Sequence, residues 1–465
     1  MSSPEPGHGA GFSTEPEYDV AAGTPALVIG PYLTQQRSGR DAAQPNDTNE
    51  ASRPPSARLE EAVGLAAAID LNVVEARLAM ISSPRPSTYL GKGKVDEIKE
   101  FVEEHEIKLV VMDCALSPVQ QRNLERAFGA KVIDRTGLIL EIFGRRARTS
   151  EGSLQVELAH LAYQKSRLVR SWTHLERQRG GFGFLGGPGE TQIEADRRLI
   201  QERMTRIERD LAGVTRTRGL HRASRRRVPY PIVAFVGYTN AGKSTLFNRM
   251  TKAKVLAQDM LFATLDPTSR AIGLPHGEKA ILSDTVGFIS DLPTMLVAAF
   301  RATLEDVIEA DILLHVRDVS HGETAAQAAD VETVLRELDI DPDDAGRIIE
   351  VWNKSDLLVG EERERLAAQI ARMAPESRPA LVSALSGEGV DDLLLLIEEH
   401  IARGRPSYHI LLDPSDGKGL NWLYENAEVL GRDDRDEALA LRVRIANEKE
   451  PRLLRRFPKA RRLRN

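Results

Sequence analysis

The chain has 465 residues, of which 41% are hydrophobic and 28% are charged, and its formal net charge at pH 7 is −6. This length is sufficient for two to four domains. The single cysteine, Cys114, excludes an intrachain disulfide framework and a zinc site built from several cysteines. No segment approaches the roughly 18 apolar residues of a membrane span, and the start of the chain lacks the basic and apolar regions of a signal peptide. We therefore expect a cytoplasmic protein.

Positive charge is concentrated in two segments of this acidic chain. Residues 197–227 hold eleven arginines against three acidic residues, and residues 449–464 hold eight basic residues against Glu450 alone. Such local patches can bind a phosphate backbone even when the whole chain carries a negative charge. For the C-terminal segment, a solvated tail is an equally good interpretation.

The first 150 residues divide into an extension and a domain. Residues 1–55 are rich in Gly, Pro, Ser, Ala and acids, which predicts a mostly disordered extension in which residues 26–33 can add one short strand to the next domain. In residues 56–150, strands alternate with helices, which predicts a small parallel α/β domain. Its strands are expected at 75–81, 109–113 and 131–134, and its helices at 62–69, 93–105, 117–128 and 136–144. Ser117 and Pro118 are expected at the N-cap and first position of the third helix.

Residues 151–228 contain two heptad patterns separated by a segment that no helix tolerates. Mostly apolar residues recur at alternating spacings of four and three in residues 154–175 and again in 193–211, with Lys165 and Arg197 as the basic exceptions. Residues 180–189 between them are rich in glycine. We predict an antiparallel helical hairpin with a glycine-rich tip, followed by a basic linker.

The predicted tip carries apolar residues with no obvious core to enter, namely Phe182, Phe184 and Leu185, and it is flanked by Arg177, Arg179 and Arg197. Two interpretations are equally open from spacing and composition. The tip is either a loop packed on its own protein or a flexible probe that enters a structured RNA, where its aromatic rings stack on bases.

The next segment, residues 229–405, begins with an apolar strand at 231–236 and the pattern G-x-x-x-x-G-K-[ST]. Gly237 and Gly242 let the backbone curl so that its amides hold phosphate oxygens at the start of a helix. The Lys243 ammonium can reach the β- and γ-phosphates. In this P-loop we assign nucleotide binding to Gly237, Tyr238, Thr239, Asn240, Ala241, Gly242, Lys243, Ser244 and Thr245.

The remainder of the chain predicts a doubly wound sheet and a small terminal domain. Within residues 229–405, a β-hairpin is expected at 271–283, and further strands at 312–316, 348–352 and 380–382 alternate with helices near 323–338, 360–374 and 389–402. Residues 406–465 predict a small α+β domain with a basic tail, with strands at 408–412 and 439–445 and a helix at 420–427.

Two loops behind the P-loop carry residues expected to sense the third phosphate of a nucleotide. Thr264 can close on Mg²⁺ and the γ-phosphate, Asp284 can hold Mg²⁺ through water, and the Gly287 amide can meet the γ-phosphate. The predicted catalytic residues are Lys243, Thr264 and Gly287, and the predicted metal ligands are Ser244, Thr264 and Asp284. Nucleotide contacts in the two loops are assigned to Phe262, Ala263, Thr264, Leu265, Asp266, Asp284, Thr285, Val286 and Gly287.

Two later strand ends predict recognition of guanine. The Asp356 carboxylate can accept hydrogen bonds from guanine N1 and its 2-amino group, whereas adenine offers no such pair of donors. The loop after residue 382 can present a backbone amide to guanine O6. We assign base recognition to Asn353, Lys354, Ser355, Asp356, Ser383, Ala384 and Leu385. Each pattern alone is weak, but their order and positions favour GTP over ATP.

Phe288 occupies an unusual position. In Ras-type GTPases a glutamine follows the D-x-x-G motif and orients the attacking water. A phenylalanine cannot hydrogen-bond to water, so we predict slow intrinsic hydrolysis and a water oriented by something that partner binding supplies. The alternative is that another side chain or the Thr264 backbone orients the water alone.

Taken together, the motifs of residues 58–412 resemble those of the HflX family of ribosome-associated GTPases. The specific parts are Tyr89–Lys94, the Gly180–Gln192 tip, Phe262–Thr268, Asp284–Phe288 and Ala299–Glu305. The resemblance implies binding to the 50S ribosomal subunit and splitting of stalled 70S ribosomes in the GTP state. It also implies that the hairpin tip probes the peptidyl-transferase region, which favours the RNA interpretation of the tip.

We therefore expect a monomeric, Mg²⁺-dependent GTPase that splits or rescues 70S ribosomes and contacts rRNA through the tip and the basic patches. The first alternative is a ribosome-assembly GTPase that binds large-subunit rRNA without splitting, although no KH module with a GxxG loop is visible. A tRNA-modifying GTPase would carry a reactive C-terminal cysteine, and Cys114 lies elsewhere. A nucleotide switch that acts only on a protein partner does not explain the arginine-rich hairpin.

Overall fold

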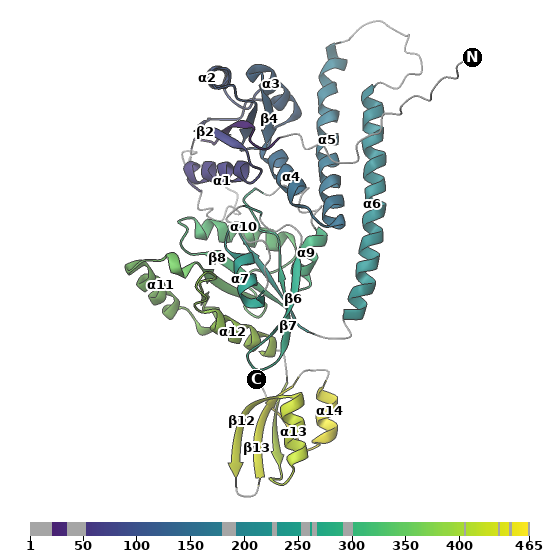
Figure 1. Cartoon of the computed structure of the whole chain (residues 1–465), viewed down its shortest axis with the longest axis vertical. Coiled ribbons are helices and arrows are strands. Elements are labelled where there is room, and N and C mark those ends of the chain that lie inside the picture. Colours follow the sequence, from purple (N-terminus) through teal and green to yellow (C-terminus); the bar gives the residue numbers. More distant parts are fainter. Residues whose placement is uncertain are drawn as a thin grey trace, which may run out of the picture. The chain divides into compact units, whose positions relative to one another are not determined.

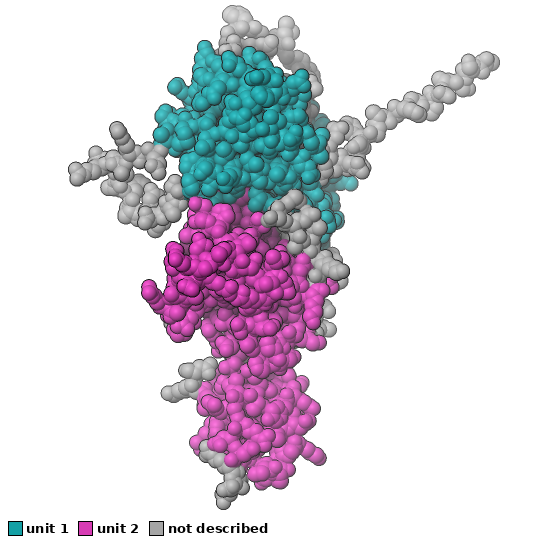
Figure 2. All heavy atoms as spheres, turned by 60° about the vertical axis from the view of Figure 1, so that its left-hand side comes forward, with its two compact units in different colours: residues 1–214, 260–262, 293–299 teal, residues 215–259, 263–292, 300–465 magenta. Residues whose placement is uncertain are grey.

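The structure is a computed structural model that describes residues 21–34, 53–178, 192–225, 230–252, 261–262, 267–291, 301–403, 406–435, 438–445 and 449–463 (Figure 1). The chain is divided into two compact units (Figure 2). The first comprises residues 1–214 with 260–262 and 293–299, and the second comprises residues 215–259, 263–292 and 300–465. Among the described residues, no helix combines the length and the apolar character needed to cross a membrane.

The first unit contains a four-stranded parallel sheet with the strand order β2-β1-β3-β4. Its strands are β1 (Pro25–Gly30), β2 (Asn72–Leu78), β3 (Leu109–Met112) and β4 (Lys131–Asp134), and its helices are α1 (Pro55–Ala67), α2 (Lys92–Glu104), α3 (Pro118–Phe128) and α4 (Arg135–Arg146). The parallel α/β fold predicted for this region is confirmed. Strand β1 lies in the segment expected to be an extension, yet it pairs with both β2 and β3, and its side chains from Ala26 to Ile29 are completely buried.

Helix α3 begins as its sequence predicts. The Ser117 hydroxyl accepts a hydrogen bond from the Gln120 amide (3.2 Å), and the Gln120 side chain accepts one from the Ser117 amide (2.8 Å). This capping box satisfies two backbone donors at the helix start. Pro118 is the first helical residue, where its missing N–H removes no helical hydrogen bond.

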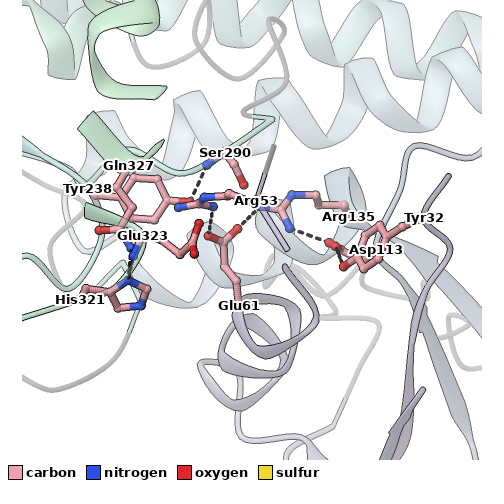
Figure 3. A network of polar contacts seen from close by, with 10 residues as sticks. All are labelled: Tyr32, Arg53, Glu61, Asp113, Arg135, Tyr238, Ser290, His321, Glu323 and Gln327. Atoms are coloured by element: carbon pink, nitrogen blue, oxygen red, sulfur yellow. Dashed lines mark hydrogen bonds and ion pairs between the residues drawn. The ribbon is translucent and has the colours of Figure 1, made fainter. Parts of the chain in front are cut away.

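A chain of buried polar side chains lies at the carboxyl end of this sheet (Figure 3). Arg135 donates to Asp113 (2.5 Å) and to Glu61, Glu61 also accepts from Arg53 (2.8 Å), and Asp113 accepts from the Tyr32 hydroxyl. Burial and the Asp113 charge raise the pKa of Tyr32, so this hydroxyl stays protonated. The opposite charges compensate one another, which is the condition under which charges can be buried.

Asp134, the last residue of β4, attaches a long helix to the sheet. Its side chain is 2% exposed and accepts four hydrogen bonds. Two come from the backbone amides of Gly137 (2.8 Å) and Leu116 (3.1 Å), and two come from α5 (Ser150–Gln178), through the Tyr163 hydroxyl and the Arg167 guanidinium (both 2.6 Å). Burial and the Asp134 charge raise the pKa of Tyr163. The Asp134 carboxylate therefore helps to fix helix α5 to the α/β domain, together with a hydrogen bond from Arg167 to Gln121 of α3.

Helices α5 and α6 (Gln192–Arg225) lie side by side and antiparallel, as predicted (Figure 1). The Arg203 guanidinium of α6 pairs with both carboxylate oxygens of Glu157 on α5, at 2.7 and 3.0 Å. On α5, Val156 and Ala159 are buried, because this helix also packs on α3 and α4. The glycine-rich tip at 180–189 lies outside the described residues, so both interpretations of it remain predictions.

The second unit contains a six-stranded sheet with the order β10-β9-β8-β5-β7-β6, in which only β6 is antiparallel to its neighbour. The strands are β5 (Ile232–Gly237), β6 (Thr268–Gly273), β7 (Lys279–Asp284), β8 (Ile312–Asp318), β9 (Ile348–Asn353) and β10 (Ala380–Leu381). The helices are α7 (Lys243–Thr251), α9 (Arg301–Ile308), α10 (Thr324–Glu337), α11 (Glu361–Arg372) and α12 (Val390–Arg403). The predicted P-loop GTPase fold and the predicted β6–β7 hairpin are confirmed.

An antiparallel sheet with the order β12-β13-β11-β14 completes this unit. Its elements are β11 (Ser407–Leu412), α13 (Gly417–Asn426), β12 (Glu428–Arg435), β13 (Ala438–Arg444), α14 (Glu450–Arg456) and β14 (Arg461–Leu463). The α+β module is thus confirmed. Most of the basic C-terminal segment forms α14 and β14, because Leu453 is completely buried and residues 461–463 pair with β11.

Asp134→Asn should weaken the attachment of α5 to its domain. Breaking a buried, hydrogen-bonded ion pair costs about 3 kcal/mol, and amide hydrogen exchange in residues 150–168 should therefore accelerate by about 100-fold. Asp96→Asn is the matched control, because Asp96 is exposed on α2 of the same domain. Equal exchange rates for the two variants would show that the Asp134 carboxylate does not hold the helix.

Candidate functional site

The P-loop connects β5 to α7. Glycine is required at two of its positions, because φ is positive there and because a side chain would clash with its neighbours. Gly237 has φ +149°, and a Cβ at this position would lie 2.2 Å from the Val316 carbonyl oxygen. Gly242 has φ +91°, and a Cβ there would lie 2.2 Å from the Asn353 side-chain nitrogen. Any larger residue at either position would have to displace a central strand or the Asn353 side chain.

Lys243 points back into this loop. Its ammonium donates to the carbonyl oxygens of Gly237 (3.0 Å) and Tyr238 (2.7 Å). Burial lowers the pKa of Lys243 to about 8, although the nearby Asp284 carboxylate opposes the shift. The loop therefore holds a buried cation at the N-terminus of α7, where negatively charged oxygens are favoured.

Ser244 and Asp284, two of the predicted metal ligands, lie together. The Ser244 hydroxyl donates to the Asp284 carboxylate at 2.7 Å, and Asp284 is completely buried. A hydroxyl and a carboxylate are hard oxygen donors that suit Mg²⁺, which usually keeps waters and phosphate oxygens as its other ligands. Accordingly, no group of three or more His, Cys, Asp or Glu side chains that could cage a metal occurs within the described residues. Thr264, the third predicted ligand, lies outside them.

The loop after β7 runs directly against the P-loop. A Cβ on Gly287 would lie 2.9 Å from both Cα and Cγ2 of Thr239 and 3.1 Å from the Lys243 nitrogen. Thr285 donates its hydroxyl to the Phe235 carbonyl of β5. The predicted residues Asp284, Thr285, Val286 and Gly287 are therefore brought to the phosphate-binding loop.

The two predicted guanine loops meet beside the P-loop, and Asn353 joins all three. Its side-chain nitrogen donates to the Ala241 carbonyl (2.8 Å), and its oxygen accepts from the Ala384 amide (3.0 Å). The Ser383 hydroxyl donates to Asp356 at 2.5 Å. Asp356 is exposed, so its carboxylate remains accessible to a base.

Sequence reasoning missed two residues that hold these loops in place. Asp318, at the end of β8, pairs with Lys354 at 2.7 Å. Arg249, in the last turn of α7, donates to the carbonyl oxygens of Ala384 (3.0 Å) and Leu385. The position of Asp318 at a strand end was an available signal, whereas nothing local distinguishes Arg249 from a surface arginine.

The loop expected to close on the γ-phosphate is described only at its start. Ala263, Thr264, Leu265 and Asp266 lie outside the described residues. Phe262 is buried, and its ring packs edge-on against Phe143 of α4 in the same unit, with ring centroids 4.8 Å apart. The Phe262 side chain therefore packs in the core of the first unit, and its assignment to nucleotide contact stays a prediction.

Family models match nearly the whole chain. They are described as GTP-binding GTPase N-terminal (residues 56–144), GTP-binding GTPase Middle Region (146–225), 50S ribosome-binding GTPase (232–354) and HflX C-terminal domain (369–464). A "GTPase HflX" of Magnetococcus marinus is 50% identical over 83% of this chain and 88% of its own length. The chain belongs to the HflX family of GTPases. It is therefore a GTP hydrolase of the ribosome-binding GTPase class.

Other HflX relatives extend the match. The "GTPase HflX" of Escherichia coli is 41% identical over 91% of this chain and 94% of its own length. Among solved structures, a GTP-binding protein from the hyperthermophilic archaeon Sulfolobus solfataricus in complex with GDP is 22% identical, with a TM-score of 0.41 and coverage of 81% of this chain and 98% of that one.

Binding of GDP at pH 8.5 should be accompanied by proton uptake at Lys243. With a pKa of about 8, this group is largely neutral at that pH in the nucleotide-free protein, and phosphate oxygens favour its charged form. Calorimetry in buffers of different ionisation enthalpy should detect uptake of more than about half a proton. Lys243→Arg, which stays charged, should bind GDP without this uptake, and equal uptake by both proteins would exclude Lys243 as its source.

Asp356→Asn should change the base that the site accepts. The amide can no longer accept two hydrogen bonds from guanine, and the unpaired donors should weaken GTP binding by about 100-fold or more. Xanthine offers an oxygen where guanine has its 2-amino group, so xanthosine triphosphate should bind the variant better than GTP does. Fluorescence titration with both nucleotides measures this reversal, and an unchanged preference would remove Asp356 from base recognition.

Proposed function

We propose that this HflX-family GTPase binds the large ribosomal subunit and splits stalled 70S ribosomes in its GTP state, and that hydrolysis times its release. The observation that carries the proposal is the match of residues 232–354 to the 50S ribosome-binding GTPase model in a chain that also contains the α5–α6 hairpin. We place this activity in the cytoplasm, with part of the protein bound to ribosomes as a monomer.

The hairpin has the properties that such an rRNA contact needs. Exposed arginines on α6 include Arg197, Arg198, Arg206 and Arg209, and clustered arginines favour a phosphate backbone. Because Asp134 fixes α5 to its domain, the hairpin can present its 180–189 tip from a firm base. The exposed arginines support a contact between this hairpin and structured RNA.

Hydrolysis in this proposal uses the P-loop and the two loops behind it. Ser244, Thr264 and Asp284 would hold Mg²⁺, the last through water, and the bound ion would neutralise phosphate charge. Lys243 would bind the phosphate oxygens, and the amide of Gly287 would meet the γ-phosphate. Asn353, Asp356 and the Ser383–Leu385 loop would orient the guanine base.

Phe288 supports a dependence on the ribosome. Its side chain is 1% exposed and has no hydrogen-bonding group, so it cannot orient water. We infer slow intrinsic hydrolysis, with the water oriented by a group supplied when the ribosome binds. An assembly GTPase that binds large-subunit rRNA without splitting remains the second candidate, because it would use the same basic helix.

Density-gradient sedimentation of 70S ribosomes with this protein and a non-hydrolysable GTP analogue should convert 70S particles into subunits, with the protein bound to the 50S fraction. Asp356→Asn should split ribosomes only with the corresponding xanthosine analogue, which ties the activity to this nucleotide site. Replacing residues 180–189 with a Gly-Ser linker should preserve nucleotide binding but abolish splitting.

The outcomes separate the two candidates. Intact 70S particles with the protein bound to free 50S subunits would contradict splitting and favour the assembly function. A protein that sediments with neither subunit would contradict the ribosomal function altogether.

A further inference from the structure

The P-loop and the loop after β7 are joined by a short parallel bridge between Tyr238 and Phe288. The Phe288 amide donates to the Gly237 carbonyl (3.1 Å), and the Thr239 amide donates to the Phe288 carbonyl (2.7 Å). Backbone hydrogen bonds therefore hold the segment that follows the D-x-x-G motif against the phosphate-binding loop itself.

The Tyr238 side chain reinforces this bridge. Its ring is 4% exposed, and its hydroxyl accepts a hydrogen bond from the Ser290 backbone amide at 2.9 Å (Figure 3). The residues on either side of Tyr238 thus bond the backbone of Phe288, and the Tyr238 side chain bonds the same loop two residues further on. We call residues 284–291 in this arrangement the closed loop.

The closed loop already contacts P-loop groups that a third phosphate would have to reach. The amide of Thr239, a residue predicted to bind the nucleotide, already donates to the Phe288 carbonyl. Gly287 lies so close to Thr239 and to the Lys243 nitrogen that even a Cβ would not fit between them. A γ-phosphate needs to contact the lysine and the Gly287 amide together, so residues 287–288 have to move away from the P-loop before it can enter.

We propose that Tyr238 is a positioning residue that holds the closed loop and thereby sets the affinity of this GTPase for GTP relative to GDP. GTP binding breaks the bonds that hold residues 287–290, whereas GDP, which lacks the γ-phosphate, leaves them in place. Opening the loop offsets part of the binding free energy of GTP. Weaker bonds between the closed loop and the P-loop therefore make GTP binding more favourable.

Tyr238→Phe tests this role, because it keeps the buried ring and removes only the hydroxyl that accepts a hydrogen bond from the Ser290 amide. Titration of the full chain with GDP and with guanosine 5′-(β,γ-imido)triphosphate should show about fivefold tighter binding of the triphosphate, the effect of one neutral hydrogen bond. The dissociation constant of GDP should change by less than about twofold. The measured quantity is therefore the ratio of the dissociation constants of GDP and the triphosphate.

A matched control separates this role from a general effect on folding. Tyr408→Phe removes another tyrosine hydroxyl, one bonded to Glu450 in the C-terminal module, and should leave the ratio unchanged. A purely structural role would alter both dissociation constants of Tyr238→Phe in proportion.

The pair can also be tested as a unit. Ser290→Pro removes the donor of the same hydrogen bond, so Tyr238→Phe added to it should produce no further change in the ratio. An unchanged ratio in Tyr238→Phe, or weaker binding of the triphosphate alone, would overturn the proposal. Because no ribosome is present, either result leaves the ribosomal function untouched.

Discussion

A buried ammonium group needs oxygen partners. The Lys243 ammonium finds them in the P-loop, the loop directly before it in the chain. The carbonyl oxygens of Gly237 and Tyr238 accept hydrogen bonds from it, and Gly237 lies so close to Val316 of β8 that a side chain there would not fit. Burial lowers the pKa of Lys243, and the nearby Asp284 carboxylate opposes that shift. The site is therefore arranged around a cation that phosphate oxygens would stabilise further.

The remaining parts of the site follow from this arrangement. Asn353 fixes the curled loop from the side by donating to the Ala241 carbonyl, and through the Ala384 amide it holds the two predicted base-recognition loops beside the P-loop. On the other side, Gly287 approaches the lysine as closely as a residue without a side chain can. One polar side chain and one missing side chain thus connect the P-loop to the predicted base-recognition loops and to the loop after β7.

Local features of the fold could be predicted from the sequence, and features that depend on distant contacts could not. The P-loop, the α3 cap and the β6–β7 hairpin are each specified by a few neighbouring residues, so their signals are complete within a short window. Strand β1 was predicted only as an optional addition, because its central place depends on pairing with β2 and β3. Likewise, nothing near Asp134 or Arg249 in the sequence indicates a partner more than 25 residues away.

The attachment of α5 has a mechanical consequence. The last described bond from this helix to Asp134 is made at Arg167, and the helix continues for eleven residues to Gln178, a length of about 16 Å. A force applied at the far end of α5 would act at this distance from the point where the helix is attached to the Asp134 carboxylate. Part of a load on the hairpin would therefore pass through Asp134 into the end of β4, and the parallel sheet would anchor the hairpin.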